Sequence, residues 1–260
     1  MDPALVVVKL QKIAEGAGVA LYRGKADGRD VAVKESERTR YALRELAVLG
    51  NIPSHPHIVQ LLAHRIDGPK VTLVFEYLEG STLDVWFDSR KPPQQEVRDI
   101  FRQLASAVAH LHRHDVAHRD IKPINAIVVA AEQRVVLFDF DIACIVGRTE
   151  EDVVCDFNEI VGTNDYMAPE VWAQSMTSSR DLFAADVYSL GVTYYRLLEG
   201  VVPYEGEEGS DYLRAILDEP LRPLETVEGR RLAPLIERML NSDERQRPTV
   251  EQVLAALSSE

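Results

Sequence analysis

Apolar and polar positions alternate along the first part of the chain in the manner of β-strands. Residues 30–34 form a short run rich in β-branched side chains, and residues 71–77 form another. Asp27-Gly28 precedes the first run and predicts a tight hairpin turn. Residues 79–81 (Glu-Gly-Ser) break the second run. We therefore expect a sheet-rich region over about residues 1–77.

Beyond residue 81 the apolar side chains recur at helical spacing. The clearest stripe follows residue 96, and it predicts a helix with one buried face made of Val97, Ile100, Phe101, Leu104, Val108 and Leu111. The change from strands to helices suggests two lobes of an α+β fold, with a hinge at about 76–81. We expect residues 1–260 to form one domain.

Composition and charge narrow the classes of function. A chain of 260 residues with 46% hydrophobic content can bury a sizeable core or two smaller ones around a cleft. The net charge of −13 argues against a broad face for binding nucleic acid, so no nucleic-acid partner is expected. No apolar run is long enough for a signal peptide or a membrane span, which predicts a soluble protein.

The cysteine content predicts the redox compartment. Cys144 and Cys155 are the two cysteines, too few for a disulfide framework, and their spacing matches no zinc site. We therefore expect a reducing, intracellular location, cytoplasmic or nuclear.

Residues 118–125 read His-Arg-Asp-Ile-Lys-Pro-Ile-Asn and bring three kinds of chemistry into one short loop. Asp120 is spaced to accept a proton from an incoming hydroxyl group. Lys122 can neutralise charge on a moving phosphoryl group, and Asn125 can hold a magnesium ion. This combination indicates phosphoryl transfer.

The loop and its surroundings resemble the eukaryotic-type protein kinases, from about Ile13 to Arg247. Residues 162–170 (Gly-Thr-Asn-Asp-Tyr-Met-Ala-Pro-Glu) match the end of that family's activation segment, and residues 186–191 (Asp-Val-Tyr-Ser-Leu-Gly) match the buried helix that follows. The resemblance implies the bilobal kinase fold, with a small, mostly β N-lobe at about 1–77. A larger, mostly helical C-lobe at about 82–260 is implied, with the ATP cleft between the lobes.

The same resemblance implies the substrates. ATP and Mg²⁺ are the expected cofactors, and the activation segment implies a protein substrate rather than a small molecule. Lys122 two residues after Asp120, with Thr163 downstream, is the serine/threonine pattern. Glu170 and Arg247 resemble the family's buried structural ion pair.

Lys34 and Glu45 are expected to form an ion pair. Tyr41 and Leu49 lie four residues to either side of Glu45, so this carboxylate shares a helix face with apolar groups and needs a cation. The resemblance implies that Lys34 pairs with Glu45 and holds the nucleotide phosphates. An ordinary structural ion pair is the alternative.

Residues 137–141 (Leu-Phe-Asp-Phe-Asp) resemble the kinase Asp-Phe-Gly motif with its glycine replaced. The resemblance implies that Asp139 and Asn125 are the magnesium ligands. Asp141 stands where the glycine is usual, so we expect it to affect rate and conformation, with backbone strain if its φ is positive.

The resemblance also implies an apolar nucleotide pocket whose glycine loop is irregular. Of the three family glycines only Gly16 is kept, because Ala14 and Val19 occupy the other two positions. The loss of two glycines is expected to stiffen this loop. The residues expected to bind ATP are Ile13, Gly16, Gly18, Leu21, Ala32, Lys34, Glu45, Phe75, Glu76, Leu78 and Ile127.

Regulation is expected at Arg119, which in the family usually meets a phosphate on the activation segment. Glu159 occupies the usual phosphosite position, so Glu159 or nearby Asp156 is predicted to pair with Arg119 without phosphorylation. A solvated acidic loop is the alternative, and Thr149 is a competing phosphosite.

Two functions stay open at this point. One is an active serine/threonine kinase, and the other is a pseudokinase that binds nucleotide or acts as a scaffold. The enzyme is favoured because the chain retains Lys34, Glu45, Asp120, Lys122, Asn125 and Asp139.

Overall fold

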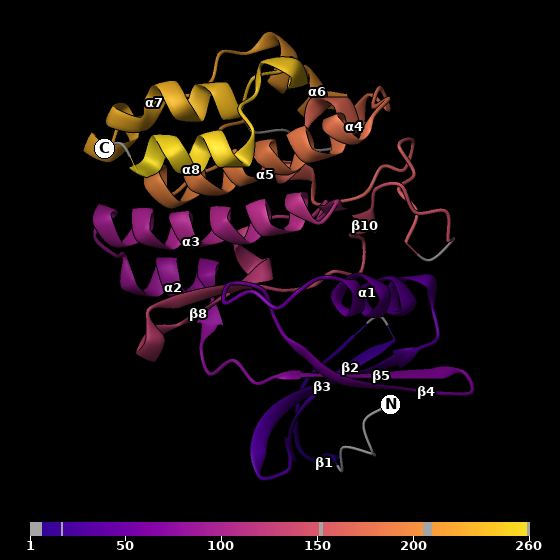
Figure 1. Ribbon diagram of the computed structural model, residues 1–260. Helices are drawn as coiled ribbons and strands as arrows, with labels where there is room; N and C mark the ends of the chain where they lie inside the picture. The colour runs from indigo at the N-terminus through magenta and orange to yellow at the C-terminus, as the bar shows by residue number, and fades with distance from the viewer. Residues whose placement is uncertain (1–6, 17, 151–152, 205–209, 259–260) are drawn as a thin grey trace.

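The computed structural model describes residues 7–16, 18–150, 153–204 and 210–258 (Figure 1). A twisted sheet occupies the N-terminal end and a stack of helices the C-terminal end, so the predicted division into two regions is confirmed. Among the described residues, none of the helices is both long and apolar enough to cross a membrane.

The N-terminal sheet has five antiparallel strands in the order β1-β2-β3-β5-β4. They are β1 (Val7–Gly16), β2 (Val19–Ala26), β3 (Arg29–Glu37), β4 (Leu61–Asp67) and β5 (Lys70–Glu76). Asp27 and Gly28 join β2 to β3 with φ values of 48° and 79°. Because type I′ turns need positive φ at both central residues, this hairpin turn is the one that the sequence predicts.

One helix, α1 (Arg40–Asn51), packs on the sheet between the two regions (Figure 1). Thr39 begins it, because its side-chain oxygen accepts a hydrogen bond from the amide of Ala42. Val48 and Leu49 are buried, and Glu45 lies on the same covered side with 2% of its surface exposed. The helix therefore carries a carboxylate into the interior, as predicted. Of the two apolar neighbours behind that prediction, Leu49 is buried but Tyr41 has 39% of its surface exposed.

The C-terminal region is built around two long helices, α3 (Gln94–Arg113) and α5 (Ser179–Glu199). All six residues of the predicted stripe on α3 are buried. The remaining helices are α2 (Leu83–Arg90), α4 (Pro169–Trp172), α6 (Ser210–Asp218), α7 (Val227–Met239) and α8 (Val250–Ser258). Arg247 donates to both carboxylate oxygens of Glu170 at 2.6 and 2.8 Å, so the predicted buried pair is present.

Short strands at the junction of the two regions position the loops. A three-stranded sheet contains β6 (Ser81–Thr82), β8 (Ala126–Val129) and β9 (Arg134–Leu137), and a two-stranded sheet joins β7 (Val116–Ala117) to β10 (Cys144–Ile145). Residues 118–125 thus run from β7 to β8, and residues 138–143 run from β9 to β10. Both loops therefore begin and end on fixed strands.

Cys144 and Cys155 form a disulfide, with their Cα atoms 5.1 Å apart. The cysteine count correctly excludes a framework of several bridges, but the expectation of a reducing setting loses its basis. The segment after β10 folds back so that two cysteines separated by 11 positions meet. Sequence spacing alone does not contain that reversal.

Histidines whose rings contact one another tie the segment between α1 and β4 to helix α3. His110 donates from Nε2 to the carbonyl of Pro53 at 2.9 Å, and the rings of His55 and His110 lie 4.7 Å apart. His57 donates from Nδ1 to the carbonyl of Val135 at 3.0 Å. Burial lowers the pKa of His55 to about 4, with repulsion from His110 and His57 adding to it. Burial also lowers the pKa of His110 and of His57.

These shifts predict that stability falls on acidification. A histidine whose folded pKa is depressed stays neutral in the fold, whereas the unfolded chain takes up a proton near pH 6.5. The contribution of these histidines to the free energy of unfolding should therefore be constant above about pH 6.5 and decrease from there toward pH 4. Thermal melts between pH 7.5 and 5 should show the wild-type melting temperature falling by roughly a few degrees more than that of His55→Gln. Exposed His64→Gln is the control, and a wild-type slope equal to that of His55→Gln would contradict the prediction.

Candidate active site

A cavity of about 580 Å³ lies between the N-terminal sheet and the short strands of the helical region. Its lining is mostly apolar, as expected of a site for a flat organic ring. Predicted residues on its wall are Ile13, Gly16, Leu21, Ala32, Lys34, Glu45, Phe75, Glu76, Leu78 and Ile127. Gly18 is the exception: it lies next to the β1–β2 turn with φ +77°, outside the lining. Its positive φ shows what this glycine does, which is to permit the turn.

Lys34 projects from β3 into this cavity and donates to Glu45 Oε2 at 2.7 Å. Its Nζ also lies 3.4 Å from Asp139 Oδ1. Burial disfavours the charged lysine, but attraction to Glu45 and Asp139 outweighs burial and raises the pKa of Lys34. The predicted pair is present, and it places a fixed positive charge on the cavity wall.

Asp120 belongs to the loop between β7 and β8, next to this cavity. Three side chains bind its carboxylate. Lys122 Nζ lies 2.7 Å from Asp120 Oδ2, and Thr163 donates its hydroxyl to Asp120 Oδ1 at 2.8 Å. Asn125 donates from Nδ2 to the side chain of Asp120 at 2.8 Å and to its backbone carbonyl at 2.9 Å. Lys122 also donates to Thr163. These four predicted residues therefore form one hydrogen-bonded group.

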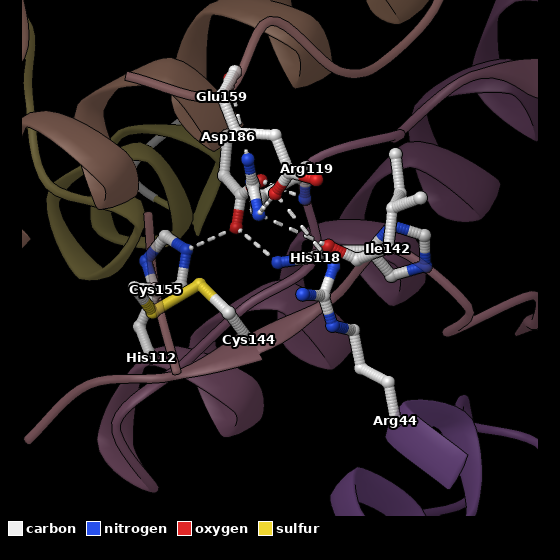
Figure 2. Close-up of a disulfide and its surroundings, with 9 residues drawn as sticks. All are labelled: Arg44, His112, His118, Arg119, Ile142, Cys144, Cys155, Glu159 and Asp186. Carbon is white, nitrogen blue, oxygen red and sulfur yellow. Dashed lines mark hydrogen bonds and ion pairs between the residues drawn. A yellow bond between two sulfur atoms is a disulfide. The ribbon is translucent and has the colours of Figure 1, made fainter. Parts of the chain in front are cut away.

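The backbone of this loop is held by Asp186 on α5. This carboxylate has 1% of its surface exposed and accepts from the amides of His118 at 2.9 Å and Arg119 at 2.8 Å. His112 Nε2 lies 2.9 Å from the same carboxylate (Figure 2). Burial opposes ionisation of Asp186, but the hydrogen bond from His112 and the electrostatic interaction with the His112 and His118 rings outweigh burial and lower the pKa of Asp186. Arg119 adopts φ +70°, a strained conformation that these bonds hold in place.

The hairpin of β8 and β9 brings the two predicted metal ligands together. Ala126 pairs with Leu137, and the amide of Phe138 donates to the carbonyl of Asn125 at 2.9 Å. Asn125 donates from Nδ2 to Asp120, so Oδ1 is the side-chain atom of Asn125 that can bind a cation, and Asp139 contributes a carboxylate on the cavity wall. The described residues contain no cluster of three or more His, Cys, Asp or Glu side chains that could hold a metal ion. Two oxygen donors fit Mg²⁺, which takes its other ligands from water and substrate phosphates.

Asp141 lies close to the same carboxylates. Burial, and then repulsion from Asp139, raise the pKa of Asp141 to about 6 although Lys34 opposes the shift. The residue with positive φ in this motif is Asp139, at +67°, rather than Asp141. The backbone strain that the missing glycine suggests therefore falls two residues earlier.

Glu159 lies among three arginines, Arg40, Arg44 and Arg119, of which Figure 2 draws the last two. It accepts from Arg119 at 3.0 Å and from Arg40 at 3.1 Å, and its Oε2 lies 3.8 Å from Arg44 Nη1. The predicted partner of Arg119 is thus Glu159 and not Asp156. Sequence reasoning missed Arg40 and Arg44, although their spacing of four residues on one helix is a signal that they share a face.

A family model described as the protein kinase domain matches residues 7–257 of this chain. Serine/threonine-protein kinase/endoribonuclease ire-1 of Caenorhabditis elegans is 34% identical over 199 residues, which are 72% of this chain and 20% of that protein. Serine/threonine-protein kinase PAK mbt of Drosophila melanogaster is 29% identical over 264 residues, 98% of this chain and 40% of that protein. Putative CBL-interacting protein kinase 13 of Oryza sativa subsp. japonica is 34% identical over 202 residues, which are 75% of this chain and 38% of that protein.

The chain thus spans less than half the length of these relatives. The matched region nevertheless includes every residue of the cavity and of the loop that Asp186 holds. The fold, the loop geometry and the sequence match agree, and we conclude that this chain belongs to the protein kinase domain family.

Proposed function

We propose that this chain is a serine/threonine protein kinase that transfers the γ-phosphoryl group of ATP to a protein hydroxyl group. The observation that supports this most is the grouping of Asp120, Lys122 and Asn125 beside a cavity that contains the ionised Lys34. Such a site supplies a proton acceptor, cations and metal ligands together, which are the parts that phosphoryl transfer requires.

The residues have distinct roles in this proposal. Asp120 orients the attacking hydroxyl and accepts its proton, and Lys122 stabilises charge on the group being transferred. Lys34, held by Glu45, binds the nucleotide phosphates. Asn125 and Asp139 would hold Mg²⁺, which supplies charge neutralisation at the phosphates. No covalent intermediate on the protein is needed.

A second cavity, of about 390 Å³, supports a protein substrate. It adjoins the acceptor site, because Lys122 and Thr163 belong to its wall. Phe87 and Ile124 make part of the wall apolar, and Ile124 has 51% of its surface exposed. An extended polypeptide could place a side chain there while its hydroxyl reaches Asp120.

The location is part of the proposal as well. An intracellular setting, cytoplasmic or nuclear, is now supported by the ATP-dependent reaction rather than by the cysteine count, because the two cysteines are joined.

Asp120→Asn is the test of this function. The amide keeps the shape of the side chain but cannot accept the proton, so transfer to a generic protein substrate should fall at least roughly 100-fold. Binding of a fluorescent ATP analogue should change less than about threefold, because Asp120 is not part of the nucleotide cavity wall. Radiolabelled ATP and a binding titration measure the two quantities.

The wild-type protein decides between the two classes of function in the same assay. Near-normal turnover by Asp120→Asn would contradict the assigned role. Wild-type protein that is stabilised against melting by nucleotide but transfers no phosphate would instead identify a pseudokinase.

We also propose that Glu159 keeps the activation segment in place without phosphorylation. Its carboxylate connects Arg119 of the catalytic loop with Arg40 and Arg44 of α1, the positions from which a phosphate could be held. Arg119 and Glu159 have 5% and 13% of their side-chain surfaces exposed, so this contact is partly shielded from salt. The contact joins three separate segments through one negative charge.

Glu159→Gln tests this role. Removal of the charge should lower turnover roughly tenfold, as for one lost charge-assisted hydrogen bond, and Glu159→Arg should lower it further. Wild-type activity should survive phosphatase treatment and decline gradually with added salt. Glu150→Gln is the matched control, because Glu150 is an exposed acid of the same segment that pairs with Arg148. Inactive dephosphorylated wild type, or full activity of Glu159→Arg, would refute the idea.

A further inference from the structure

The disulfide lies between the catalytic loop and Glu159 in the chain's path. Cys144 belongs to β10 and pairs with Ala117 of β7, the residue directly before His118. Cys144 is fully buried, whereas Cys155 is partly exposed. One end of the bridge is therefore fixed to the strand that leads into the catalytic loop, and the other end can be reached from solvent.

A short turn connects Cys155 to Glu159. Within it the amide of Asn158 donates to Asp156 Oδ1 at 2.9 Å, and the amide of Glu159 donates to the carbonyl of Asp156 at 3.3 Å. Because this turn begins at the residue after Cys155, the position of Cys155 determines where Glu159 can reach. Figure 2 shows the bridge and the contact between Arg119 and Glu159 in the same neighbourhood.

We propose that Cys144 and Cys155 are a reversible thiol–disulfide modification site that controls how firmly Glu159 is held on its arginines. The effect on activity rests on the proposed kinase function. Oxidised protein has the start of the 156–159 turn tied to β10. Reduced protein keeps that register through non-covalent contacts, such as the hydrogen bond from the Ile145 amide to the Val153 carbonyl at 2.9 Å. Opening the bridge gives the segment more conformations, so ordering Glu159 costs more free energy.

The chemistry requires a dithiol reductant and a peroxide oxidant. In reduction, one thiolate of the dithiol attacks the accessible sulfur of Cys155, and Cys144 leaves as a thiolate that takes up a proton. The second thiol of the reductant then displaces Cys155 and the reductant becomes a disulfide. In oxidation, the Cys155 thiolate attacks one oxygen of the peroxide, the O–O bond breaks, and the products are a sulfenic acid and a hydroxide ion that takes up a proton from solvent to become water. The Cys144 thiol displaces the second water and closes the bridge, which completes a two-electron exchange.

Trypsin cleavage after Arg148 tests the site without reference to activity. Arg148 lies inside the loop that the bridge closes and has 46% of its side chain exposed. Reduction with dithiothreitol should increase the rate of this cut roughly tenfold, and hydrogen peroxide should reverse the increase after the dithiol is removed. The chain contains no other cysteine, so alkylation of two thiols per reduced chain and none per oxidised chain reports the state directly.

Activity is measured on the same samples. Reduced wild type should have turnover lower by roughly three- to tenfold, with recovery on reoxidation. Cys155→Ser should show the reduced level under both conditions, and Glu159→Gln should lose its response to reduction because the bridge then has no carboxylate to position. Cys155 is chosen for substitution because it is the more exposed of the two cysteines. Reduced wild-type protein is a second sample without the bridge, and it carries no mutation.

Each outcome has a clear meaning. Equal trypsin rates and equal turnover in the two states would overturn the proposal, as would two free thiols that peroxide does not join. Different trypsin rates without phosphoryl transfer in either state would support the modification site and contradict the proposed kinase function.

Discussion

The candidate active site depends on one buried negative charge, that of Asp186, at the base of the loop over residues 118–125. Asp186 accepts hydrogen bonds from two backbone amides of that loop and from a ring nitrogen of His112. Both oxygens of this almost fully buried carboxylate therefore have hydrogen-bond partners. An ionised group in such a place is tolerated only with these partners. In return it holds Arg119 at φ +70°. Because Asp120 is the next residue, the bonds that fix the Arg119 backbone also fix the position of Asp120.

A second carboxylate, that of Glu159, connects this loop to two further segments. Arg119, fixed through its amide by Asp186, directs its guanidinium group to Glu159, which also contacts arginines of α1. The same helix carries Glu45, the partner of Lys34. Catalytic loop, activation segment and α1 are thus linked by charges, and the disulfide acts on the segment that brings Glu159 to this point. Loss of either carboxylate should therefore affect residues that it does not contact.

The sequence predicts the parts of the site that lie within continuous motifs. The strands and the stripe on α3 follow from periodicity, and the need of Glu45 for a cation follows from the cost of burying a lone charge. The choice of Lys34 as that cation follows from the resemblance to the protein kinases. What it does not predict depends on how distant segments fold together. The bridge between Cys144 and Cys155 needs the reversal of the chain after β10, and Gly18 serves the hairpin rather than the cavity. The positive φ of this motif is found at Asp139, where the sequence does not predict it.

The most direct test of this account is Asp186→Asn, followed by amide hydrogen exchange and by turnover. Asparagine has the same shape, but its nitrogen cannot accept a hydrogen bond, so one of the loop amides loses its partner. We expect exchange at His118 and Arg119 to become faster, and turnover to fall roughly 10- to 100-fold, while ATP-analogue binding to the cavity is retained. Unchanged protection of these amides together with normal turnover would contradict the claim that this buried charge holds the catalytic loop.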